Sequence, residues 1–133
     1  MKGILHTDGG ARGNPGPGAS GMVLTNSKGE LVKEKGEFLG VCTNNEAEYK
    51  ALTSGIILAL EFGVDELDCY LDSELVVKQL KGLYKVKNPG LGSLFIRVKQ
   101  LEMKFKKITY AHVKRELNKQ ADKIVNDILD RRL

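Results

Sequence analysis

The chain of 133 residues contains no tryptophan, only two cysteines and only three prolines. Cys42 and Cys69 lack the close paired spacing that is typical of a disulfide framework or a zinc site. We therefore expect both to be reduced, buried thiols of a cytoplasmic protein, with a disulfide between them as the alternative.

Long hydrophobic runs are also missing. The longest apolar stretch, residues 55–60, is far shorter than the roughly 20 residues that span a bilayer. A plausible strand begins within two residues of Met1, so we expect no signal peptide. We expect no association with a membrane.

What is present indicates an ordinary globular chain, with 41% hydrophobic and 29% charged residues. Its length fits a single domain over residues 1–133, for which we expect a monomer. The net charge of +4 is unevenly spread: residues 1–77 carry 6 basic and 12 acidic residues, whereas residues 78–107 carry 9 basic and one acidic. This asymmetry suits an enzyme that holds metal ions in one region and a polyanion in another, although a solvated basic helix is the simpler alternative.

The hydrophobic pattern predicts strands and helices in the order β-β-β-α-β-α-α-β-α. Strands are expected at residues 2–8, 19–25, 30–39, 67–71 and 107–112, with a loop over residues 9–18. Helices are expected from a Thr43 cap to Gly63, from a Ser73 cap to Leu80, at residues 93–105, and from an Asn118 cap to the C-terminus. Early hairpins followed by strand–helix alternation predict an α/β domain with helices packed on a mixed sheet.

Four carboxylates stand at predicted strand or helix ends: Asp8, Glu48, Asp72 and Asp122. Gathered in space, they would repel one another unless cations neutralised them, and hard oxygen ligands favour Mg²⁺ or Mn²⁺. Two such ions about 4 Å apart can clamp a phosphodiester for in-line hydrolysis. The pattern therefore predicts a metal-dependent nuclease.

Two glutamates of the first helix have different explanations. Glu46 completes a capping box with Thr43. Glu48 points about 200° away from Glu46 on the helix and lies on an otherwise apolar face. Glu48 is therefore the candidate ligand, with a surface glutamate as the alternative.

The glycine-rich segment after Asp8 provides candidate nucleic-acid contacts. Gly9 and Gly10 let the backbone turn and approach a ligand closely, and Asn14 lies in the turn-forming part of the segment. The segment is not a P-loop, because no Gly-Lys-Ser/Thr follows, and it is not a G-x-G-x-x-G turn before a helix. The alternative is an ordinary tight β-hairpin.

Further contacts are predicted at Thr43, Asn44 and Asn45, because free N–H groups at a helix N-terminus favour an anion. Plain helix capping is the alternative explanation. Lys85 and Lys87 belong to the basic stretch, whose side chains are expected to contact phosphates without reading sequence. His112 ends the last strand, where it would serve proton transfer or product release if it is not simply structural.

Taken together, the chain resembles type 1 ribonuclease H over nearly its whole length. The resemblance rests on the order and separation of several motifs, which are Thr7–Gly10, Gly13–Gly18, Thr43–Glu48, Asp72-Ser73, His112 and Asn118–Asp122. It implies a ribonuclease H-like fold, a five-stranded mixed sheet of order 3-2-1-4-5 flanked by helices. It also implies endonucleolytic cleavage of the RNA strand of RNA/DNA hybrids, which leaves 3′-hydroxyl and 5′-phosphate ends.

The same resemblance implies roles for individual residues. Asp8 and Asp72 would coordinate two Mg²⁺ ions centrally, with Mn²⁺ as a substitute. Asp122 would complete the metal site that activates water, and Glu48 the site that stabilises the leaving oxygen. His112 matches the family's loop histidine, Asn14 and Asn45 match positions near the RNA strand, and Thr43 matches one that grips DNA.

The chain also departs from some members of that family. It has no tryptophan-containing basic insertion, and Thr25 stands where some bacterial members place an arginine. These departures suggest that duplex RNA is an additional substrate. The alternatives are another nuclease of the superfamily, such as a junction resolvase or exonuclease, and a non-catalytic hybrid-binding module.

Overall fold

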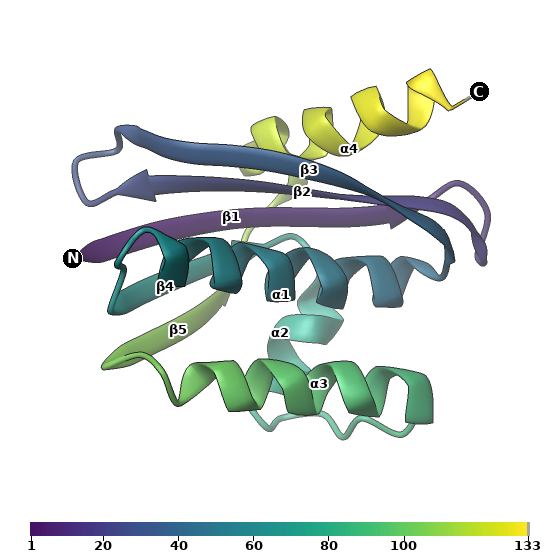
Figure 1. Cartoon of the computed structure of the whole chain (residues 1–133). Helices are drawn as coiled ribbons and strands as arrows, with labels where there is room; N and C mark the ends of the chain where they lie inside the picture. The colour runs from purple at the N-terminus through teal and green to yellow at the C-terminus, as the bar shows by residue number, and fades with distance from the viewer. Residues whose placement is uncertain (133) are drawn as a thin grey trace.

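A five-stranded mixed sheet lies at the centre of the computed structural model, which describes residues 1–132 (Figure 1). The strands are β1 (Lys2–Ala11), β2 (Gly16–Asn26), β3 (Leu31–Cys42), β4 (Glu66–Leu71) and β5 (Lys107–His112). Their order is β3-β2-β1-β4-β5, which confirms the expected topology. The β1–β2 and β2–β3 pairs are antiparallel, whereas β4 runs parallel to both β1 and β5.

Helices cover both faces of this sheet. They are α1 (Asn44–Glu61), α2 (Glu74–Leu80), α3 (Pro89–Glu102) and α4 (Lys119–Arg131), with a short 3₁₀ helix η1 (Arg115–Leu117) before α4. Figure 1 shows α4 on one side of the sheet and α1 to α3 on the other. None of the helices within residues 1–132 is long and apolar enough to cross a bilayer.

The main core lies between the sheet and α1. Tyr49, Leu52 and Ile56 line the inner face of α1 and are fully buried against Leu5 of β1 and its neighbours. The hydroxyl of Tyr49 donates a hydrogen bond of 2.6 Å to Oε1 of buried Gln79, which ties α1 to α2. Helix α1 is therefore held rigidly over β1, the strand that carries Asp8.

Cys42 and Cys69 are both free and buried, as predicted. They lie on β3 and β4, which are not neighbours in the sheet.

Two segments differ from the sequence-based expectation. Residues 9–11 and 16–18 continue the β1–β2 hairpin instead of forming a loop, with Ala11 paired to Gly18. Helix α3 begins at Pro89 rather than at residue 93, because Oδ1 of Asn88 accepts hydrogen bonds from the first free amides of the helix.

The capping box of α1 is present as predicted. Oγ1 of Thr43 accepts a hydrogen bond from the Glu46 amide at 3.1 Å, and Oε1 of Glu46 accepts one from the Thr43 amide at 2.9 Å. We expect Thr43→Ala to lower the free energy of unfolding by about 1 kcal/mol, measured by urea denaturation. Ser54→Ala on the same helix is the control and should cause no loss, because alanine is the better helix former. Equal losses in both variants would contradict a stabilising cap.

Candidate active site

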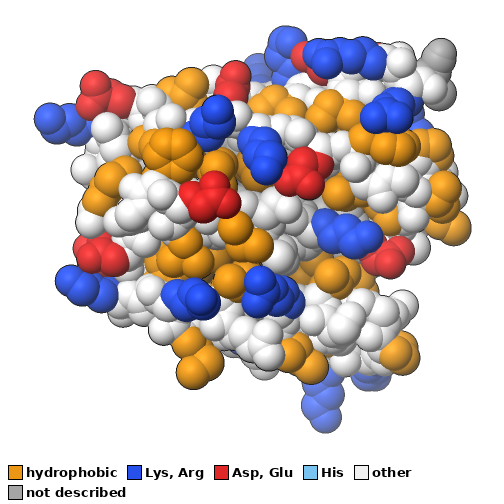
Figure 2. All heavy atoms as spheres, in the orientation of Figure 1, with side chains coloured by type: hydrophobic (Ala, Val, Ile, Leu, Met, Phe, Trp, Pro, Cys, Tyr) orange, Lys and Arg blue, Asp and Glu red, His pale blue; other side chains and the backbone are white. Residues whose placement is uncertain are grey.

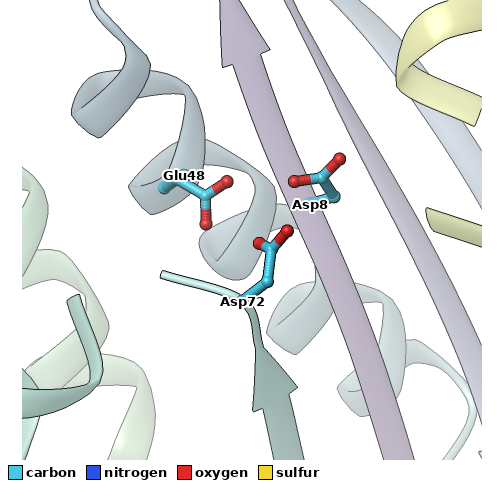
Figure 3. Close-up of side chains that lie close together, drawn as sticks. All are labelled: Asp8, Glu48 and Asp72. Atoms are coloured by element: carbon cyan, nitrogen blue, oxygen red, sulfur yellow. The ribbon is translucent and has the colours of Figure 1, made fainter. Parts of the chain in front are cut away.

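Three carboxylates converge at the point where the pairing of β1 with β4 ends. Asp8 lies on β1, Asp72 directly follows β4, and Glu48 lies one turn inside α1. One oxygen from each lies within 4.8 Å of the others, and Figure 3 shows the three groups pointing toward one another. Asp8 and Asp72 meet because β1 and β4 run parallel and their pairing ends at Thr7 and Leu71, the residues directly before these two acids.

Gly9 allows α1 to approach β1 closely enough for Glu48 to reach this edge. The Gly9 amide donates a hydrogen bond of 2.9 Å to Oε1 of Glu48. A Cβ atom at Gly9 would lie 2.5 Å from the Glu48 nitrogen and closer still to the carbonyl oxygen of Ala47. The close approach therefore requires glycine at this position.

Asp122 joins the three carboxylates from the first turn of α4, and its Oδ1 accepts a hydrogen bond of 3.1 Å from Arg115. All four carboxylates line one open cavity of about 370 Å³. Its other lining residues are Gly9, Gly10, Ala11, Arg12, Asn44, Asn45, Ser73, Arg115, Val125, Asn126 and Leu129.

Burial and mutual repulsion make these acids hard to ionise. Burial, followed by the charge of Asp72 and that of Asp122, raises the pKa of Asp8 to about 7. Burial and the charge of Asp8 also raise the pKa of Glu48 well above its ordinary value, partly opposed by the Gly9 amide. A cation bound between the groups would remove this repulsion.

The donor set fits a hard divalent cation. Oε2 of Glu48 is buried and has no hydrogen-bond partner among the described residues, so it is free to serve as a ligand. Carboxylate oxygens are the ligands that Mg²⁺ and Mn²⁺ prefer. Asp8, Glu48 and Asp72 are therefore the residues best placed to hold such an ion, with Asp122 beside them.

The predicted contacts near the β1–β2 hairpin form one hydrogen-bonded unit. The Asn44 amide donates to Oδ1 of Asn14 at 3.0 Å, and Oδ1 of Asn44 accepts from the Ala11 amide at 2.9 Å. These bonds tie the turn of the hairpin to the start of α1. Gly9, Gly10, Asn44 and Asn45 line the cavity, whereas Thr43 is engaged in the capping box.

Lys85 and Lys87 are exposed in the segment between α2 and α3, away from the carboxylates. Lys85 borders a separate groove of about 500 Å³ with Tyr84, Phe95 and Ile96. Figure 2 shows the Lys and Arg side chains of the α1–α3 face interspersed with hydrophobic and uncharged ones. On this face the positive charge is spread out rather than gathered into one patch.

Two further predicted residues, His112 and Asn118, have surroundings that differ from the prediction. His112 is exposed at the end of β5, paired with Leu71 in the sheet, and is not among the residues that line the cavity. Asn118 occupies the N-cap position of α4, but its side chain makes no capping bond, which corrects the predicted cap. Its Nδ2 instead donates a hydrogen bond of 2.8 Å to the Thr7 carbonyl, because burial against β1 favours that partner.

Sequence reasoning missed Arg115, which reaches Asp122 from η1. A single arginine in a basic segment carries no local pattern. Its one available signal was its place between the last strand and Asp122, in the loop where the family resemblance puts a histidine.

The raised pKa of Asp8 predicts how the stability of the metal-free protein depends on pH. The folded-state pKa of about 7 lies above the ordinary value of 3.8, so the folded state holds the proton more tightly than the unfolded state. The contribution of Asp8 to stability is therefore fully present below about pH 4 and is lost as the pH rises toward 7. We expect a loss of roughly 2 to 4 kcal/mol from this group.

Urea unfolding of the wild type and Asp8→Asn, in EDTA between pH 4 and pH 8, isolates this effect. The wild type should lose stability relative to the variant as the pH rises, and Mg²⁺ should restore stability to the wild type near pH 8. A difference between the two proteins that stays constant with pH would contradict the assignment.

Comparisons with known proteins agree with this geometry. The family profile described as "Reverse transcriptase-like" matches residues 6–128. Ribonuclease HI of Halobacterium salinarum is 42% identical over 123 residues, which cover 92% of this chain and 62% of that protein. The crystal structure of RNase H1 from the same organism is 39% identical, with a TM-score of 0.96 and 98% of each chain covered.

Two further matches extend the comparison. A bifunctional protein of Mycobacterium tuberculosis is 40% identical over 98% of this chain, and the chain spans only 36% of that protein. The structure of LC11-RNase H1 in complex with an RNA/DNA hybrid is 40% identical, with a TM-score of 0.90 and 94% of each chain covered.

Proposed function

Because this chain belongs to the type 1 ribonuclease H family, we propose that it is a metal-dependent endonuclease that hydrolyses the RNA strand of RNA/DNA hybrids. The observation that carries the proposal is the convergence of Asp8, Glu48 and Asp72 at one sheet edge, with Asp122 in the same cavity. A binding module would gain nothing from buried carboxylates that repel one another.

The finer mechanism is part of the same proposal. Two Mg²⁺ ions, or Mn²⁺ in their place, would supply Lewis acidity toward the attacking water and the leaving 3′-oxygen, giving 3′-hydroxyl and 5′-phosphate products. Asp8 and Asp72 would hold both ions, Glu48 one and Asp122 the other. The Gly9 amide donates a hydrogen bond to Oε1 of Glu48 and so orients this carboxylate before substrate arrives.

Substrate selection is proposed to follow from the hairpin and the start of α1. Gly9, Gly10 and Asn45 line the same cavity as the carboxylates, and Asn14 accepts a hydrogen bond from the amide of Asn44, which also lines it. Backbone and amide groups there can contact the RNA 2′-hydroxyl and the backbone phosphates. The relative LC11-RNase H1 has been solved with an RNA/DNA hybrid, which supports this substrate class. Thr43, Asn44, Lys85 and Lys87 would add contacts to phosphates, and His112 would assist proton transfer or product release.

The remaining parts of the proposal are a monomeric enzyme and a cytoplasmic location. Two free thiols support the location, because disulfides are rare in reducing compartments.

A panel of labelled duplexes tests the function. We expect Mg²⁺-dependent cutting of the RNA strand within an RNA/DNA hybrid, no cutting of DNA/DNA and no cutting in EDTA. Cutting of RNA/RNA would add duplex RNA as a second substrate. Cutting from ends only, or of branched DNA only, would favour another nuclease of the superfamily, and tight hybrid binding without cutting would favour a binding module.

A further inference from the structure

A second cavity lies at the first turn of α4 and has no role in the proposed function. It measures about 310 Å³ and is lined by His6 of β1 and by residues 116–121, which join η1 to α4. None of these residues lines the active-site cavity. A ligand of this second cavity would therefore occupy a site of its own, close to the carboxylates but separate from them.

The wall of this cavity carries hydrogen-bonding groups that lack partners. The side chain of Asn118 does not cap α4, and the first amides of a helix have no partner inside it. The Asp122 amide donates to the Asn118 carbonyl, so the amides of residues 119–121 precede the first closed turn. Asn118 is 2% exposed, and its Oδ1 has no hydrogen-bond partner among the described residues. Unfilled donors beside an unfilled acceptor indicate a ligand that has both kinds of group.

Two side chains of the cavity suit the faces of a flat ring. The imidazole of His6 stacks on Tyr70 of β4, with ring centroids 5.2 Å apart and an angle of 21° between the planes. Tyr70 does not line the cavity, so the cavity lies on the side of the imidazole away from Tyr70. Leu117 lines the cavity from η1 and is 66% exposed although it is apolar. A planar ring between His6 and Leu117 would continue the aromatic stack and cover the leucine.

The acidic group of the cavity selects among flat rings. Glu116 lines the cavity and is exposed on η1. A carboxylate accepts two adjacent N–H donors, and among the common nucleobases guanine alone presents such a pair, N1–H and N2–H, beside the acceptor O6. Adenine and cytosine place a ring acceptor next to their amino group, which a carboxylate repels. The free amides of α4 are matching donors for O6.

We propose that this cavity is a binding site for a guanine base, stacked on His6 and covered by Leu117, with the carboxylate of Glu116 accepting from N1–H and N2–H. The first amides of α4 donate to O6, and Oδ1 of Asn118 accepts the remaining hydrogen of N2. The base belongs to a free guanine nucleoside or to an unpaired guanosine in a nucleic-acid strand, for which exposed Lys119 offers a contact to phosphate.

Titration of the ¹⁵N-labelled protein with nucleosides in EDTA tests the site, because the readout needs no cleavage. Guanosine should shift the amide signals of residues 116–121 and the ring signals of His6, and these shifts should saturate. Adenosine and cytidine should bind at least about tenfold more weakly, because they lack the paired donors for the carboxylate.

Two exposed side chains separate the edge of the base from its face. Glu116→Gln should weaken guanosine binding about tenfold, because the charged acceptor for N1–H and N2–H is lost. Leu117→Ala should weaken it about threefold through lost packing on the ring. Glu61→Gln is the matched control, since Glu61 is exposed at the end of α1 and lines neither cavity. Urea unfolding should be the same in all three variants, because none of the changed side chains is buried.

A short strand of uridines with one guanosine identifies the source of the base. If this strand shifts the same signals at lower concentration than guanosine does, and a strand of uridines alone does not, the base is carried by a strand. If only guanosine shifts them, the ligand is a free nucleoside. Both results support the site.

Three results would overturn the inference. They are the absence of a saturating shift at residues 116–121 with guanosine and with the strand, equal affinity for guanosine and adenosine, and unchanged guanosine affinity in Glu116→Gln. A failure to cut RNA/DNA hybrids would leave these binding results untouched. The proposed function and this inference therefore fail separately.

Discussion

Asp8→Asn should reduce Mg²⁺-dependent hydrolysis of an RNA/DNA hybrid by at least about a thousandfold, which corresponds to the several kcal/mol that a catalytic metal contributes. One oxygen of Asp8 lies within 4.8 Å of oxygens of both Glu48 and Asp72. An amide in its place removes a negative charge and one strong ligand from the set. The measurement is single-turnover cleavage at saturating enzyme, which separates chemistry from hybrid binding.

The same variant should be more stable than the wild type in EDTA at pH 7 to 8, because the amide relieves the repulsion that raises the pKa of Asp8. Loss of activity together with a gain in stability in EDTA would show that the charge of Asp8 serves catalysis and not folding. Misfolding would lower both activity and stability. Asp127→Asn is the matched control, since Asp127 pairs with Lys123 on α4, does not line the active-site cavity and should leave cleavage unchanged. An active Asp8→Asn enzyme would refute the metal site.

Much of this site could be predicted because its acids occupy positions with a strong local signal. Asp8 and Asp72 each close an apolar run of the sequence, and helical geometry separates Glu48 from the capping residue Glu46. The strand order depended on the family resemblance, because local patterns do not state which strands are neighbours.

The parts that could not be predicted depend on tertiary partners. Residues 9–18 contain many turn formers, yet most of the segment pairs as a hairpin, because its glycines permit close packing against neighbouring elements. Asn118 is a residue type that commonly caps helices, but its side chain donates a hydrogen bond to a buried carbonyl on β1 instead. The position of Arg115 beside Asp122 depends on η1, which has no clear signal in the sequence.

Gly9→Ala should lower the free energy of unfolding by about 3 kcal/mol, the upper range for overpacking, and should reduce cleavage by roughly a hundredfold. The added methyl group would overlap the backbone of α1 at Ala47 and Glu48, so the helix must move away from β1. Glu48 would then move away from Asp8 and lose its hydrogen bond from the Gly9 amide. Urea denaturation and single-turnover cleavage measure the two effects.

Gly92→Ala is the control. It separates the general effect of replacing glycine by alanine from the steric overlap that the added methyl group causes at position 9. Gly92 lies inside α3, and a Cβ atom there meets no atom within 4 Å among the described residues. That variant should gain about 0.5 to 1 kcal/mol of stability, because alanine loses less backbone entropy in a helix, and should retain full activity. If Gly9→Ala kept both stability and activity, the close packing of α1 on β1 would not be what brings Glu48 to the other acids. If stability fell while activity was retained, catalysis would not need Glu48 in its present position, and Asp8 and Asp72 would be the main metal ligands.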